Sequence, residues 1–165
     1  MKLESIENIN LLKTSKVTNI NSMFMNDVKL QTLDVSSFDT SNVISMNYMF
    51  GAVSSVTSLD LSNFNTNKVT SMDFMFSSMT SLTDLNVLSF DTSKVTTMSN
   101  MFNGCRKIKT LDLSSFDMSN VTSIAGMFTA TYNLKYACGR SEEDLVKLND
   151  SSTGISMTCE FTLKS

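Results

Sequence analysis

The chain has 165 residues, 41% hydrophobic and 18% charged, with a formal net charge of −3. This size and balance are typical of one soluble folded domain. A weakly acidic chain with only two arginines is poorly suited to bind nucleic acid or an anionic membrane surface. No apolar run approaches the roughly 20 residues that span a bilayer, so we expect no membrane insertion by this segment.

Residues 1–16 lie outside the pattern that dominates the rest of the chain. They carry scattered apolar residues, among them Ile6 and Ile9, which we interpret as an N-terminal cap that covers the first repeat. The terminal units of a repeat array are expected to be atypical, because one of their sides meets water. The segment has acidic residues where a secretion signal would need an apolar stretch.

One motif then recurs every 26 residues. Its four full copies are Leu33–Phe50, Leu59–Phe76, Leu85–Phe102 and Leu111–Phe128. A fixed period of this length is typical of a solenoid, in which each coil covers the apolar face of its neighbour. We therefore expect a single, mainly β domain with about five coils over residues 17–136.

Each unit divides into three parts. In the first part of one copy, Leu59 and Leu61 alternate with polar residues, which is the signature of a strand with one buried face. A run rich in Asp, Asn, Ser and Thr follows and predicts a turn, with the Asx side chain bonded to nearby backbone. The third part, V-x-x-[MI]-x-x-M-F, predicts a short second strand that runs into a 3₁₀ turn.

Like residues stack in this arrangement. The expected core consists of columns of Leu, Val and Met and of two Phe ladders, one through Phe76 and one through Phe64 and Phe90. Threonines also recur, at Thr14, Thr40, Thr66 and Thr92 and again at Thr18, Thr70, Thr96 and Thr122. We interpret them as hydroxyl files along a flat face, a feature also seen in ice-binding solenoids. Ile44 and Met118 interrupt the files and no T-x-T pair recurs, so we expect no ice binding.

The repeat loses its register after Leu134, where Ala137 and Gly139 replace the expected large apolar residues. Ser141 to Leu148 predicts a short helix with Ser141 as its N-cap and acidic residues in its first turn. Residues 155–163 alternate between apolar and polar side chains and predict a strand. We interpret residues 137–165 as a C-terminal cap that closes the open end of the sheet.

The chain offers little for catalysis or metal binding. Histidine is absent, which removes imidazole ligands and the usual Ser-His and Cys-His pairs. We therefore expect no enzyme activity, no metal and no cofactor. A disulfide between Cys138 and Cys159 and two free thiols are both compatible with the sequence, and Cys105 would be the odd cysteine.

The motif LDLSSFDMSNVTSIAGMF at Leu111–Phe128, its three sister copies and the F-x-G-C step at Phe102–Cys105 resemble the BspA-like leucine-rich-repeat surface proteins. This resemblance implies a curved solenoid with a parallel sheet on its concave face. It also implies display at the cell surface or outside the cell, adhesion, and binding of a protein or glycan partner.

In such a solenoid the outward side chains of the first strand would form the binding face. These side chains are small, polar and mildly acidic, which suits a basic or hydroxyl-rich partner. The expected binding residues are Thr32, Asp34, Ser36, Ser58, Asp60, Ser62, Asp84, Asn86, Thr110, Asp112, Ser114 and Tyr136. The alternative is a structural or display spacer without a ligand of its own, because this face lacks the Trp and Arg anchors of binding hot spots.

Overall fold

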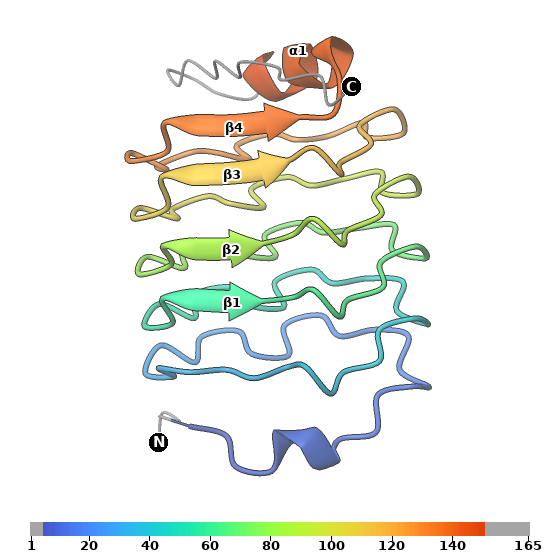
Figure 1. Cartoon of the computed structure of the whole chain (residues 1–165), viewed down its shortest axis with the longest axis vertical. Helices are drawn as coiled ribbons and strands as arrows, with labels where there is room; N and C mark the ends of the chain where they lie inside the picture. Colours follow the sequence, from blue (N-terminus) through green and yellow to red (C-terminus); the bar gives the residue numbers. More distant parts are fainter. Residues whose placement is uncertain (1–4, 151–165) are drawn as a thin grey trace.

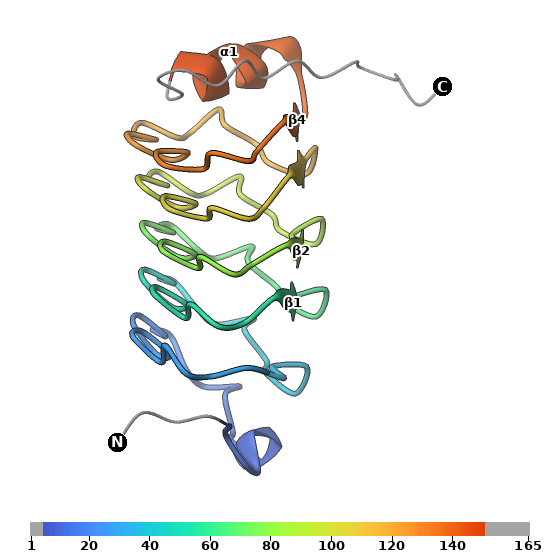
Figure 2. The ribbon, with the colours of Figure 1, turned by 90° about the vertical axis from the view of Figure 1, so that its left-hand side faces the viewer.

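The computed structural model describes residues 5–150. The chain winds into coils that lie one above the next, with the short strands of successive coils on the same side (Figure 1). Figure 2 shows the stack from the side, with an N-terminal segment at one end and a helix at the other. The elements are η1 (Ile9–Leu11), β1 (Ser58–Asp60), β2 (Asp84–Asn86), β3 (Thr110–Leu113), β4 (Tyr136–Gly139) and α1 (Glu142–Asp150).

Strands β1 to β3 form where the alternating part of the motif predicts them, whereas the strand predicted in the first copy, around Leu33 and Val35, is absent. The strands pair in parallel one repeat apart. Leu59 in β1 lies opposite Leu85 in β2, and Leu111 in β3 lies opposite Ala137 in β4. Within the described residues, strand pairing is confined to these two pairs. The strand ladder reaches Gly139, beyond Leu134, where the sequence pattern loses its register.

The prediction of a second strand in each coil is wrong, because this part of each coil makes only single parallel bridges. The bridges run from coil to coil through Asn19, Ser45, Ser71, Thr97 and Ser123. Beyond each bridge, successive backbone N–H groups donate alternately to a carbonyl of the next coil and to a carbonyl of their own coil. The N–H of Phe50 donates to the carbonyl of Met75 in the next coil, at 2.9 Å, and the N–H of Met49 donates to Met46 in its own coil, at 3.2 Å. Half of the donors thus close turns, and the other half join the coils.

These turns require left-handed backbone at two positions in each coil. A positive φ at the third residue of a turn is what a type II turn demands, and Asn100, Gly104 and Gly126 satisfy it with little strain. Tyr48 and Phe74 occupy the same column as Asn100, with φ of 57° and 58°. For a residue with a Cβ this conformation costs roughly 1–2 kcal/mol.

The predicted Phe ladders are present and fill the interior. Along the first ladder the ring centroids of neighbouring coils, such as Phe50 and Phe76, lie 5.5 to 5.8 Å apart and nearly parallel. The second ladder joins Phe64, Phe90 and Phe116 at 6.2 to 6.5 Å. These separations fall in the range of offset-stacked aromatic rings. Because the same ring returns every 26 residues, each coil covers the ring of the next.

The first threonine column is buried, so its interpretation as a surface file of hydroxyls is wrong. The exposed fraction is 7% for Thr14 and 2% or less for Thr40, Thr66 and Thr92. The Thr66 hydroxyl donates to the carbonyl of Asp91 and accepts from the Asp91 N–H, both at 2.8 Å. The hydroxyls of Thr40, Thr66 and Thr92 thus each satisfy both backbone groups of one residue in the following coil, and that of Thr14 accepts the Asp39 N–H.

α1 closes the C-terminal end of the stack, and the predicted helix is confirmed. Ser141 caps it, since its hydroxyl accepts the Asp144 N–H at 3.1 Å. Met118 stands in the threonine column and has no hydroxyl to offer a further coil. Its N–H instead donates to Asp144, and its carbonyl accepts from Lys147 at 2.8 Å. The strand predicted at residues 155–163 lies outside the described residues.

The Phe76→Ala substitution should lower the free energy of unfolding by about 3–5 kcal/mol, because the ring is fully buried between two others. Urea denaturation measures the change. Leu88→Ala is the matched control, because Leu88 is 51% exposed, and its effect should stay within about 0.5 kcal/mol. Similar losses in both variants would contradict the buried ladder.

The Thr66→Val substitution keeps the shape of the side chain but leaves the N–H and carbonyl of Asp91 without their partner. We expect it to lower the free energy of unfolding by about 1–3 kcal/mol. Thr96→Val is the control, because the exposed Thr96 hydroxyl makes one backbone bond, to Thr70. Equal stability of the Thr66 variant and the wild type would show that the buried hydroxyl column is dispensable.

Candidate functional site

The predicted binding residues lie in the strands, directly after them, or in the matching part of the first repeat, and those with described side chains are exposed. In β1 the exposed side chains of Ser58 and Asp60 flank Leu59, which is buried. This alternation follows from the strand geometry, which points successive side chains to opposite faces. The other exposed members are Thr32, Asp34, Ser36, Ser62, Asp84, Asn86, Thr110, Asp112 and Ser114. Tyr136 lies in β4, and its side chain is outside the description.

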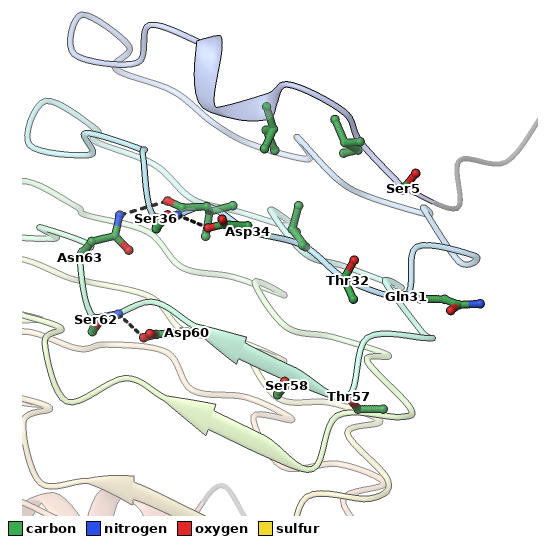
Figure 3. Close-up of a pocket in the computed structure, with 14 residues that line it drawn as sticks. Ser5, Gln31, Thr32, Asp34, Ser36, Thr57, Ser58, Asp60, Ser62 and Asn63 are labelled. Atoms are coloured by element: carbon green, nitrogen blue, oxygen red, sulfur yellow. Dashed lines mark hydrogen bonds between the residues drawn. The ribbon is translucent and has the colours of Figure 1, made fainter.

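This face is concave near the N-terminal end of the stack. A pocket of about 460 Å³ lies over the first coils, and Figure 3 shows the residues around it. Six predicted residues line it, namely Thr32, Asp34, Ser36, Ser58, Asp60 and Ser62. Ser5, Ile6 and Ile9 of the N-terminal segment also line it. Sequence reasoning missed these three, because the segment does not follow the repeat and its packing position cannot be read from a period.

A second pocket of about 350 Å³ continues the first along the strands. It is lined by Ser58, Leu59, Asp60, Ser62, Asp84 and Asn86, and it shares three of these residues with the first pocket. We call the combined depression the strand-face groove, defined by Thr32, Asp34, Ser36, Ser58, Asp60, Ser62, Asp84 and Asn86. Thr110, Asp112 and Ser114 of the prediction line neither pocket.

Two carboxylates of the groove are held by their own backbone. The Asp34 Oδ1 accepts the Ser36 N–H, and the Asp60 Oδ1 accepts the Ser62 N–H, each at 2.9 Å (Figure 3). Hydrogen bonds from the Ser36 hydroxyl and backbone lower the pKa of Asp34, and those from the Ser62 backbone and hydroxyl lower the pKa of Asp60. Both groups are therefore anionic at neutral pH and can only accept hydrogen bonds.

The same Asx geometry recurs outside the groove, as the sequence predicts for the turn column. Asp39, Asp91 and Asp117 each accept the backbone N–H of the serine two residues later, at 2.9 to 3.0 Å. The hydrogen-bonded aspartate is thus a structural device of the coil. What distinguishes Asp34 and Asp60 is their position in a concave part of the surface.

The two cysteines in the described part are free thiols there. Cys105 is buried, its Sγ donates to the carbonyl of Phe76 at 3.1 Å, and burial raises its pKa to about 12. A thiol with such a pKa is a poor nucleophile at neutral pH. Cys138 is half-buried in β4, and Cys159, its candidate disulfide partner, lies outside the described residues.

Within residues 5–150, no cluster of three or more Cys, Asp or Glu side chains has the geometry to hold a metal ion. The described helices are also too short to cross a bilayer, since α1 has nine residues.

The stacked coils and the groove define a repeat protein with a polar, anionic surface depression. The sequence matches the family described as Mycoplasma protein of unknown function, DUF285, over residues 1–86 and again over residues 60–157. Because these matches together span most of its length, the chain belongs to this family. The two matches overlap over about one repeat, consistent with a family built from such units. No curated protein and no solved structure matches the chain.

The lowered pKa values of Asp34, Asp60 and the turn aspartates predict a loss of stability in acid. A carboxyl whose folded pKa lies below its unfolded value stabilises the protein above about pH 4, and this contribution disappears as the pH falls through the folded pKa. The Asp60→Asn variant keeps the oxygen that accepts the Ser62 N–H but cannot titrate. Its Tm should therefore fall less than that of the wild type between about pH 5 and pH 2. Parallel Tm curves for the two proteins would contradict the lowered pKa.

Proposed function

We propose that the chain is a non-enzymatic binding module of the BspA-like leucine-rich-repeat class, displayed at the cell surface or secreted. In this proposal the stack of coils is a leucine-rich-repeat solenoid, and the strands form its concave sheet face. The 26-residue period, the stacked Phe rings and the parallel strands one repeat apart support this assignment. An adhesin-type protein of this kind holds a protein or glycan partner on the strand face.

The observation that carries the proposal is the strand-face groove. It brings together eight of the predicted binding residues, and the non-repeating N-terminal segment walls one end of it. Because Asp34 and Asp60 are anionic acceptors, the groove suits a partner that offers donors, such as lysine and arginine side chains or sugar hydroxyls. A rigid scaffold of stacked coils would hold these acceptors in place before the partner arrives, which lowers the entropic cost of binding.

The chemistry of the groove supports binding over catalysis. A general acid or base works best with a pKa near the operating pH, whereas Asp34 and Asp60 have pKa values shifted in the opposite direction. The remaining groove side chains are four hydroxyls, the Asp84 carboxylate and one amide. The chain has no histidine to activate a hydroxyl as a nucleophile.

The alternative is a structural or display spacer. It is favoured by the hydrogen bonds that Asp34, Asp60, Asn86 and Asp112 make to their own backbone, since these account for the aspartate column without a ligand. A spacer would tolerate any change in the groove that preserves these turns.

The test compares two double variants of the same kind. Asp34→Asn with Asp60→Asn removes two of the three carboxylates of the groove and leaves Asp84. Asp39→Asn with Asp91→Asn removes two charges from the turn column. Both should fold, because Asn86 and Asn65 occupy these columns naturally and accept the same N–H bond. The assay is adhesion of protein-coated beads to cultured epithelial cells and to purified extracellular-matrix proteins.

We expect the groove variant to lose about tenfold or more in binding, equivalent to about 1.4 kcal/mol, and the turn-column variant to keep most of it. Adhesion that is absent in the wild type, or equal in both variants, would favour the spacer.

A further inference from the structure

Tyr48 and Phe74 interrupt the repeat on a different part of each coil from the groove. They lie in the segments that return from the bridge positions, which run behind the strand layer in Figure 1. Their rings stack with centroids 4.4 Å apart and planes 6° from parallel. In the other coils the same column holds Ser22, Asn100 and Gly126. The aromatic pair is therefore a local departure from a pattern that small residues satisfy elsewhere.

The fold has no evident need for these two rings. Both residues are partly exposed, whereas the Phe ladders that fill the interior are fully buried. Both also adopt the left-handed backbone that disfavours bulky side chains, with φ of 57° and 58°. Aromatic residues at strained, partly exposed positions point to a role in recognition rather than in stability.

Two planar polar side chains, Asn47 and Asp73, immediately precede the rings, and the structure holds each of them rigidly. The Asn47 Oδ1 accepts the Ser71 hydroxyl at 2.6 Å and the Asp73 N–H at 2.9 Å. The Asp73 Oδ1 accepts the Thr97 hydroxyl at 2.5 Å and the Ser99 N–H at 2.7 Å.

These bonds leave the second atom of each group available. Within residues 5–150, no hydrogen bond engages the Nδ2 of Asn47 or the Oδ2 of Asp73. No buried side-chain nitrogen or oxygen of the described part lacks a partner, so both atoms reach solvent. One is a fixed donor and the other is a fixed acceptor.

We propose that Tyr48, Phe74, Asn47 and Asp73 form a glycan-binding patch. A pyranose ring has an apolar C–H face that packs on an aromatic ring and hydroxyls at its edge that both donate and accept. The neighbouring coil offers only Ser22 beside Tyr48, so the outer face of that ring is not covered by another aromatic side chain. The Nδ2 of Asn47 and the Oδ2 of Asp73 supply the matching donor and acceptor.

A glycan fits this patch better than a protein surface does. Protein interfaces bury about 800 Å² on each partner and surround their aromatic anchors with a broad rim of contacts. Here the aromatic surface consists of one stacked pair, and its column neighbours Ser22, Asn100 and Gly126 are small. The patch shares no residue with the strand-face groove, so it stands independently of the function proposed for that groove.

The test is a printed glycan array probed with the wild type and with the double variant Tyr48→Ser, Phe74→Asn. Each substitution introduces the residue that a sister coil carries in this column, so the variant should fold with a Tm within a few degrees of the wild type. Tyr132→Ser is the matched control, because Tyr132 is 77% exposed and lies in a different part of the coil. We expect the wild type and the control to bind the same glycans and the double variant to lose at least about tenfold in affinity.

Three results would overturn the proposal. The wild type could bind no glycan, including the case in which it binds only proteins. The double variant could bind glycan as the wild type does, or the Tyr132 control could lose as much binding as the double variant. The groove variant, Asp34→Asn with Asp60→Asn, separates the two sites. Glycan binding that is lost in the groove variant and kept in the aromatic double variant would assign the glycan to the groove and reject the patch.

Discussion

The 26-residue register between coils is the constraint on which the rest of the structure depends. Alternate N–H groups of one coil donate to carbonyls of the next, as Phe50 does to Met75, so the coils cannot slide without breaking a whole row of bonds. The same register places Phe50 over Phe76 and lets each buried threonine serve a backbone group one coil away. Hydrogen bonding, aromatic packing and polar satisfaction therefore specify one arrangement together.

This register leaves part of the surface free to vary, since some exposed side chains, such as Thr96, bond to the neighbouring coil and others do not. The strand-face groove and the aromatic pair are two uses of that freedom. The groove forms where the non-repeating segment around Ile6 and Ile9 meets the first coils. The pair forms where Tyr48 and Phe74 replace small residues at a turn. The left-handed backbone costs roughly 1–2 kcal/mol at each of the two residues, whereas the stacked pair contributes about 0.5–1.5 kcal/mol. Stacking therefore does not offset the strain.

The ends of the stack show how such an array stops. Met118 takes the place of threonine and offers no hydroxyl to a following coil, and Asp144 and Lys147 of α1 engage its backbone instead. The helix thus bonds directly to the backbone of the last full coil.

The sequence alone determined the period, the positions of β1 to β3, the Phe ladders and the Asx turns, because each depends on local spacing that repeats. It determined α1 through the Ser141 N-cap and the acidic first turn. It predicted a second strand where the structure has single bridges, because a spacing of three apolar residues fits both a strand and a string of turns. It also placed Thr66 on the surface, since a hydroxyl gives no sign of whether it meets water or the backbone of a neighbouring coil. Only the tertiary structure decided that Asp34 and Asp60 share a groove with Ile9. That contact joins the repeats to a non-repeating segment, whose packing position no period specifies.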